Sequence, residues 1–173
     1  MNKYQITFNT WNKIAQLYQA KFMDLDLYDD SYDAFCQQLK KSAPSILEIG
    51  CGPGNITKYL LSKIPDAKIL GIDIAPNMID LAKANNPKAK FEVMDARALD
   101  LPDAKYDAIL CGFCLPYLSE GNVTKMIADS GRLLEEKGLL YLSCIEGDYQ
   151  ASGFQVGSSG GRMYVYYYLE QDL

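Results

Sequence analysis

The sequence predicts an α/β protein whose core is a doubly wound, mostly parallel, twisted sheet. From residue 45 onward, short apolar runs rich in β-branched residues alternate with segments in which apolar residues recur every three or four positions. A parallel sheet requires this alternation, because a helix must carry the chain back between consecutive strands. The runs expected to form strands are 45–49, 68–72, 90–94, 106–111 and 139–145.

Helical segments separate these runs. The first has apolar residues at every fourth position over 56–64 and ends at Pro65, which cannot continue a helix. The second begins at Pro76, a residue suited to a first helical turn, and ends within 85–87. A later helix is expected to end at Gly138, where glycine would form a left-handed cap.

The two ends of the chain are less regular. We expect residues 1–40 to form a helical cap or lid over the sheet edge, and residues 41–173 to form the ligand-binding α/β domain. Together they make one domain. Residues 147–161 are rich in Gly and Ser and are expected to be loop, whereas the tyrosine-rich run 163–168 is expected to pack against the sheet.

Composition restricts the classes of partner. The 173 residues are 49% hydrophobic, enough for one core, and the net charge of −5 disfavours nucleic acid. No apolar stretch approaches the roughly 20 residues that cross a bilayer, and the start of the chain carries no export signal. Five cysteines, an odd number, suggest reduced thiols. We therefore expect a cytoplasmic monomer or homodimer with no membrane partner.

A glycine-rich turn follows the first predicted strand and opens a helix. Residues 50–54 read Gly-Cys-Gly-Pro-Gly, and glycines let the main chain approach a ligand closely. A dinucleotide fingerprint would place its third glycine where this chain has Asn55. A nicotinamide cofactor is therefore disfavoured relative to an adenosyl amino acid, which carries no phosphate.

Two acidic residues end the next two strands. Asp73 stands where a carboxylate accepts hydrogen bonds from ribose hydroxyls, and Asp95 where one accepts from the exocyclic amine of adenine. Because the carboxyl ends of parallel strands converge, these acids should share one pocket with Gly50, Gly52 and Cys111.

Four segments in this order carry a family resemblance: Leu-Glu-Ile-Gly-Cys-Gly-Pro-Gly over 47–54, Gly-Ile-Asp-Ile-Ala-Pro-Asn-Met over 71–78, Met-Asp-Ala over 94–96, and Tyr-Asp-Ala-Ile over 106–109. They resemble the class I S-adenosylmethionine-dependent methyltransferases, in the small-molecule group related to ubiquinone and menaquinone biosynthesis. The resemblance covers about residues 40–146. It implies a Rossmann-like fold, S-adenosylmethionine as cofactor, S-adenosylhomocysteine as product and a small-molecule methyl acceptor.

The resemblance also implies which residues would contact the methionine portion of that cofactor. Gly50, Cys51 and Gly52 would pack against it. Glu48 would support the loop and, indirectly, the cofactor amino group. Cys111 would offer its backbone carbonyl to the same amino group.

The nucleoside portion has its own implied contacts. Asp73 would hold the ribose hydroxyls, and Ile74 and Met78 would flank the adenine ring. Asp95, with the backbone amide of Ala96, would bind the edge of that ring.

Residues for the acceptor are less specified. The N-terminal helix resembles the lid of the family, and other polar residues follow the fourth and fifth strands. The candidates are Trp11, Tyr18, Tyr117, Glu146, Tyr149 and Arg162. The chain has no histidine, the commonest general base, and we assign no catalytic residue.

The sequence departs from the family pattern at two places. Ala75 stands where the family often has Ser, which weakens a helix cap. Compared with the family pattern, we expect the C-terminal strands of the sheet to be missing, because residues 169–173 would only begin the helix that precedes them. Either the sequence is truncated or the exposed sheet edge is covered in another way.

Alternative interpretations remain at this stage. Cys111 and Cys114 form half of a zinc site, but no second pair accompanies them, so we expect no metal. A non-catalytic S-adenosylmethionine-binding or scaffold protein would keep the same crevice. A nicotinamide-dependent oxidoreductase is the third alternative, disfavoured by Asn55.

Overall fold

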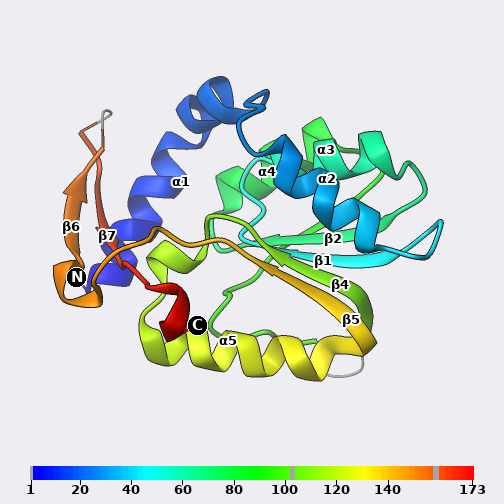
Figure 1. Cartoon of the computed structure of the whole chain (residues 1–173). Coiled ribbons are helices and arrows are strands. Elements are labelled where there is room, and N and C mark those ends of the chain that lie inside the picture. Colours follow the sequence, from blue (N-terminus) through cyan, green and yellow to red (C-terminus); the bar gives the residue numbers. More distant parts are fainter. Residues whose placement is uncertain (1, 102–103, 158–159) are drawn as a thin grey trace.

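The computed structural model describes residues 2–101, 104–157 and 160–173, and Figure 1 shows a central sheet between two layers of helices. All five strands of this sheet are parallel, in the order β3-β2-β1-β4-β5. The strands are β1 (Ser45–Ile49), β2 (Lys68–Asp73), β3 (Lys90–Val93), β4 (Tyr106–Cys111) and β5 (Leu134–Leu142). The predicted doubly wound α/β fold is confirmed.

Strand β1 lies at the centre of the sheet. Leu47 pairs with Leu70 on one side and with Ile109 on the other. The order of the strands along the sheet reverses between β1 and β4. In open parallel sheets a ligand crevice forms at this reversal, outside the carboxyl ends of the strands.

Helices cover both faces of the sheet (Figure 1). On one face lie α2 (Asp29–Gln38), α3 (Asn55–Lys63) and α4 (Pro76–Asn85). The other face carries α5 (Glu120–Leu133), whose apolar side pairs with the buried side chains of β1 and β4. No helix in the described part of the chain is both long and apolar enough for a bilayer crossing.

Helix α2 belongs to the layered core. Its Tyr32 and Phe35 are buried beside Ile46 and Leu60. Only α1 (Lys3–Phe22) lies over the end of the sheet as a cap. The packing therefore changes between α1 and α2, and not at residue 40, where we expected the cap to end. The spacing of apolar residues shows that a helix has a buried face, but it does not show which part of the protein that face packs against.

A hairpin forms where we expected loop. Within residues 147–161, of which 158 and 159 lie outside the described residues, Gly153–Val156 forms β6. This strand pairs antiparallel with β7 (Arg162–Val165) in a separate two-stranded sheet beside α1 (Figure 1). Glycine and serine content predicted loop here, but pairing with β7 supplies the backbone partners that the local sequence does not indicate.

The hairpin anchors α1 through hydrogen bonds between residues far apart in the chain. The hydroxyl of Thr10 donates to the carbonyl of Arg162 (2.5 Å), and the N–H of Tyr164 donates to the hydroxyl of Thr7 (2.9 Å). The tyrosine-rich run continues into the core, where Tyr166 is almost completely buried. The prediction that this run packs against the sheet is confirmed for the side chains that enter the core.

The junction between α5 and β5 differs from the expectation. The helix ends at Leu133, and the left-handed residue is Lys137 (φ 62°) and not Gly138. Tyr106 pairs with Leu134, but two residues later β4 already pairs with Leu139, so the residues between form a bulge. Pairing with β4 starts the strand early and shortens the helix. Strand β5 then forms the sheet edge among the described residues.

Glycine 71 provides a test of the packing between β2 and β3. A Cβ atom at Gly71 would lie 2.6 Å from the ring of Phe91, so Gly71→Ala should lower the free energy of unfolding by roughly 1–3 kcal/mol. Gly131→Ala is the matched control, because its Cβ would meet nothing within 4 Å and alanine favours helices by about 0.5–1 kcal/mol. Urea unfolding followed by circular dichroism measures both. Equal effects of the two substitutions would contradict this packing.

Candidate functional site

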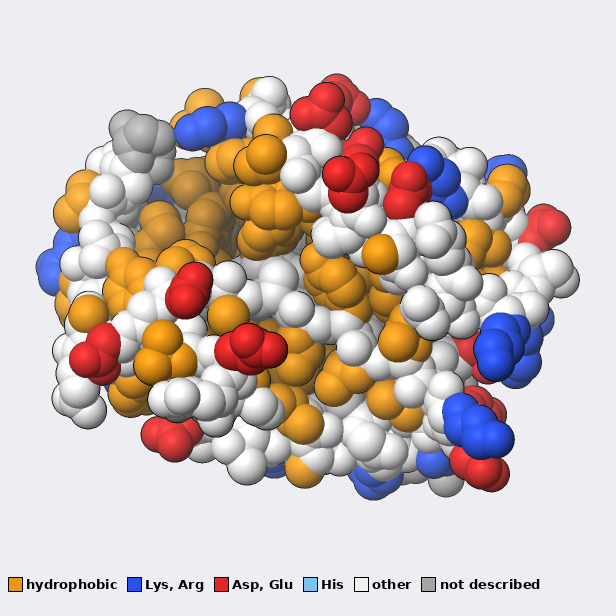
Figure 2. Space-filling view, in the orientation of Figure 1, with side chains coloured by type: hydrophobic (Ala, Val, Ile, Leu, Met, Phe, Trp, Pro, Cys, Tyr) orange, Lys and Arg blue, Asp and Glu red, His pale blue; other side chains and the backbone are white. Residues whose placement is uncertain are grey.

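A cavity that is open to solvent lies at the carboxyl ends of the strands beneath α1, and the space free of protein atoms there, open solvent included, is about 1020 Å³. Figure 2 shows that this face of the molecule is hollowed and that hydrophobic side chains line the hollow. Most residues that the sequence suggests for a site line the cavity. They are Trp11, Tyr18, Gly50, Cys51, Gly52, Asp73, Ile74, Met78, Asp95, Ala96 and Tyr117. The expected convergence of the strand ends is therefore present.

The glycine-rich turn is held against its two neighbouring strands. The N–H groups of Gly50 and Cys51 both donate to the carbonyl of Ile72 on β2 (2.8 and 2.9 Å). Gly50 has φ 70°, and a Cβ there would lie 2.7 Å from the Cβ of Cys114. A glycine is required at this position because the loop after β4 approaches the turn closely.

Asp73 connects the glycine-rich turn to the start of α4. Its Oδ2 accepts the N–H of Gly52 (3.0 Å), and its Oδ1 accepts the N–H of Ala75 (2.8 Å). Ala75 itself makes no side-chain cap, as its residue type predicts, and the aspartate replaces it. Burial raises the pKa of Asp73, while the two backbone hydrogen bonds act in the opposite direction. Each carboxylate oxygen keeps a lone pair for a further donor.

Asp95 has a partner that sequence reasoning missed. The guanidinium of Arg97 donates from Nε to Oδ1 and Oδ2 of Asp95 (both 2.9 Å) and from Nη2 to Oδ2 (2.5 Å). Burial alone would raise the pKa of Asp95, but the hydrogen bonds from Arg97 lower it. Asp95 is therefore a carboxylate at neutral pH. Any further hydrogen-bond donor that binds Asp95 must share the carboxylate oxygens with Arg97.

Glu48 lies beneath the glycine-rich turn and does not line the cavity. It is 1% exposed, its Oε2 accepts the hydroxyl of Thr57, and its Oε1 has no partner among the described residues. Burial raises the pKa of Glu48 to about 8. The carboxyl group is therefore mostly protonated at neutral pH.

The proposed contact of Cys111 with a ligand is not supported by its position. Its carbonyl accepts the N–H of Ser143 (3.1 Å), and its buried side chain does not reach the cavity. The chain directly after β5 still pairs with the end of β4, so this carbonyl faces the neighbouring chain. Gly112, Phe113 and Cys114 line the cavity in its place.

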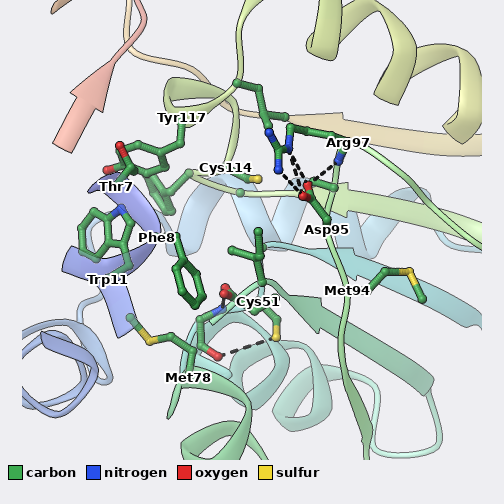
Figure 3. Close-up of a pocket in the computed structure, with 18 of the residues that line it drawn as sticks. Thr7, Phe8, Trp11, Cys51, Met78, Met94, Asp95, Arg97, Cys114 and Tyr117 are labelled. Carbon is green, nitrogen blue, oxygen red and sulfur yellow. Dashed lines mark hydrogen bonds and ion pairs between the residues drawn. The ribbon is translucent and has the colours of Figure 1, made fainter. Parts of the chain in front are cut away.

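Aromatic side chains form the wall that faces the strand ends. The ring of Trp11 meets the rings of Tyr18 (5.4 Å between centroids) and Tyr117 (5.3 Å) edge to face. Tyr117 comes from a short 3-10 turn, η1 (Leu115–Tyr117). Figure 3 shows Thr7, Phe8 and Trp11 across the opening from Asp95. Burial raises the pKa of Tyr18 to about 12 and raises that of Tyr117 as well, so both hydroxyls stay neutral.

Three residues suggested for the acceptor lie away from the cavity. Glu146 forms an isolated bridge with Tyr168, Tyr149 stacks on Tyr166, and the guanidinium of Arg162 lies over the ring of Phe154 (4.4 Å). The chain turns away from the strand ends after β5 to build the hairpin. Residues that follow a strand in the sequence therefore do not all lie at the cavity.

Sequence reasoning also missed several residues of the cavity. They are Tyr4, Thr7, Phe8, Asn55, Ile56, Met94, Arg97, Gly112, Phe113, Cys114 and Leu118. The spacing of Tyr4, Phe8 and Trp11 along one face of α1 would have found the first of these. No sequence pattern marks Arg97, because its position depends on the ion pair that it forms in the folded chain.

Titratable groups in the part of the chain that the structure describes do not gather into a metal site. No three His, Cys, Asp or Glu side chains within residues 2–101, 104–157 and 160–173 are arranged to hold a metal ion.

Comparison with known proteins gives concordant results. A family model described as a methyltransferase domain matches residues 46–138. A putative methyltransferase, 235L, of Invertebrate iridescent virus 6 is 35% identical over 113 residues, 65% of this chain and 40% of the viral protein. A demethylmenaquinone methyltransferase of Tropheryma whipplei is 31% identical over 137 residues, 75% of this chain and 55% of that protein. The chain thus spans about half the length of the curated relatives it matches.

The likeness extends to solved structures. A solved structure of the DhpI-SAH complex matches with a TM-score of 0.75, covering 96% of this chain and 80% of the DhpI chain, at 15% identity. At this identity the match is evidence of a shared fold.

The buried carboxyl group of Glu48 predicts a pH dependence of stability. Its pKa rises from an ordinary 4.5 to about 8 on folding, so between these pH values the folded chain keeps a proton that the unfolded chain has released. The free energy of unfolding should therefore fall as the pH rises from 5 to 8. Glu48→Gln should remove this contribution, and its stability relative to wild type should increase with pH.

Urea unfolding at pH 5, 6, 7 and 8 measures the effect, with Glu136→Gln on the exposed surface as the control. A constant difference between Glu48→Gln and wild type across this range would show that Glu48 is ionised in the folded chain.

Proposed function

Because the chain belongs to the methyltransferase-domain family, we propose that it binds S-adenosylmethionine in this cavity and transfers the methyl group to a small-molecule acceptor. One observation carries the proposal. The glycine-rich turn and Asp73 form a single hydrogen-bonded unit whose open side faces a mostly apolar cavity. The methyltransferase names of the relatives and the S-adenosylhomocysteine in the DhpI structure support the same assignment.

The residues present fit such a cofactor. The oxygens of Asp73 keep lone pairs for two ribose hydroxyls. Ile74, 39% exposed, and Met78 offer an apolar surface to the adenine ring. A pyrophosphate would need cationic or free N–H groups, but Arg97 is the only Lys or Arg among the described lining residues. A nucleoside thioether therefore fits better than a dinucleotide.

The remaining cofactor contacts follow from position. We assign the methionine portion to Gly50, Cys51 and Gly52, with Glu48 supporting the turn from beneath. The edge of the adenine ring would meet Asp95 and the amide of Ala96. Of the acceptor candidates, Trp11, Tyr18 and Tyr117 keep this role because they line the cavity.

The protein contributes positioning and exclusion of water more than acid–base chemistry. When bound, S-adenosylmethionine supplies a methyl group activated by a sulfonium. The aromatic side chains of α1 and η1 would shield the reacting atoms and hold the acceptor in line. We assign no residue of this chain as a general base.

We propose in addition that the protein is cytoplasmic and acts without nucleic acid, as a monomer or homodimer. All five cysteines are free thiols, as a reducing compartment favours, and the net charge is −5.

Asp73 provides the test of cofactor binding. Asp73→Ala should weaken binding of S-adenosylhomocysteine about 10- to 100-fold, because hydrogen bonds to a charged partner contribute about 1.5–3 kcal/mol. Isothermal titration calorimetry measures this loss. Asp80→Ala, an exposed aspartate on α4, is the control and should bind as wild type does. Circular dichroism must show that Asp73→Ala remains folded, since the substitution also removes two backbone hydrogen bonds.

The same calorimetry separates the alternative functions. Unchanged affinity in Asp73→Ala, or a rise in melting temperature with NADH but not with S-adenosylhomocysteine, would overturn the assignment. Binding without transfer of a labelled methyl group to any acceptor in a metabolite panel would indicate a non-catalytic binding protein.

A further inference from the structure

Arg97 is the one cationic side chain among the described residues that line the cavity, and the proposed cofactor does not account for it. Its side chain is 33% exposed. Asp95 takes the N–H of Nε and one N–H of Nη2. A guanidinium has five N–H donors, so three remain, and the two on Nη1 have no partner among the described residues.

The guanidinium is held rigidly in place. Besides its fork on Asp95, it lies over the ring of Tyr4, with 4.5 Å between the guanidinium carbon and the ring centroid. The hydroxyl of Tyr4 in turn donates to Ser119 (2.9 Å) and accepts from Asn122 (2.7 Å), which fixes the ring. Figure 3 shows Arg97 beside Asp95, across the opening from Trp11. A donor fixed in this way loses little entropy when it binds a ligand.

Two polar groups of the cavity wall that lack a partner among the described residues are hydrogen-bond donors. The indole N–H of Trp11 is buried in the wall and has no partner among the described residues. Together with Nη1 of Arg97 it complements a ligand that only accepts hydrogen bonds. A carboxylate or phosphonate is such a ligand, whereas an ammonium group only donates.

Among the described residues that line the cavity, no group is left over to remove a proton from the acceptor. The chain has no histidine, and the two lining carboxylates are engaged, Asp73 by the ribose hydroxyls of the proposed cofactor and Asp95 by Arg97. The hydroxyls of Tyr18 and Tyr117 stay neutral. An acceptor that must lose a proton before it can attack would find no general base among these groups. An acid that is already ionised at neutral pH needs no base.

We propose that the methyl acceptor is a small oxyacid whose anionic group binds the free N–H donors of Arg97, so that the protein forms a methyl ester. This inference rests on the proposed function. A lone pair of the anionic oxygen forms the new O–CH₃ bond while the S–CH₃ bond breaks and its electrons remain on sulfur. The oxyanion becomes a neutral ester, or a monoester of a phosphonate with one charge fewer. No proton is released from the acceptor, and Arg97 acts by positioning the anion.

The test compares an acid with its neutral isostere. With S-adenosylhomocysteine saturating, calorimetry should show that phenylacetate binds at least tenfold more tightly than phenylacetamide to the wild-type chain. The same titration with phenylphosphonate shows whether the site binds a phosphonate or a carboxylate more tightly. Arg97→Gln should reduce the preference for acid over amide about 10- to 100-fold, and Arg97→Lys should keep part of it. Arg132→Gln removes an arginine outside the cavity and should leave the preference unchanged.

The preference is measured within each variant, so a general loss of stability does not imitate the result. A second readout is the proton count in weakly buffered solution, where methyl transfer to an ionised acid releases none and transfer to a hydroxyl or protonated amine releases one. Equal binding of acid and amide, an unchanged preference in Arg97→Gln, no binding of either acid, or one proton released per turnover would each overturn the proposal. If the wild-type chain does not bind S-adenosylhomocysteine at all, the proposed function itself is overturned.

Discussion

The carboxylate of Asp73 is the contact on which the geometry of the site depends. It accepts one N–H from the glycine-rich turn after β1 and one from the first residues after β2, so two loops on neighbouring strands share one buried acid. The turn is further tied to the carbonyl of Ile72. These bonds position the main chain of Gly50 and Gly52 before any ligand arrives. A ligand that binds Asp73 therefore meets a surface that is already organised.

The second requirement is a wall opposite the strand ends, and this wall is held from a distance. Helix α1 lies over the end of the five-stranded sheet, and its hydrogen bonds with β7 join residues more than 150 positions apart. The backbone N–H of Tyr166 donates to the carbonyl of Pro116 (2.7 Å), so the same C-terminal segment also fixes the turn that carries Tyr117. The hairpin thus determines where both aromatic parts of the cavity stand, although none of its strand residues lines the cavity.

The acids near the cavity have different environments and therefore different charges. Glu48 is enclosed with one unpaired oxygen, and burial raises its pKa to about 8. Asp95 is only partly buried, and its hydrogen bonds with Arg97 lower its pKa. Two carboxyl side chains near the same cavity thus carry a proton in one case and a charge in the other. The difference depends on whether a cationic partner compensates the loss of water.

The sequence by itself determined the features that are local or periodic. Alternating strands and helices, the turn at Gly50 and the acids Asp73 and Asp95 could all be read from residue order, because parallel strands bring their carboxyl ends to one edge whatever the connecting loops do. Only the tertiary structure decided the rest. Pairing with distant partners made a hairpin of a Gly-rich segment and carried Glu146 and Tyr149 away from the cavity. The ion pair with Asp95 brought Arg97 into it. Such contacts depend on chain segments that meet only after folding, and no local pattern records them.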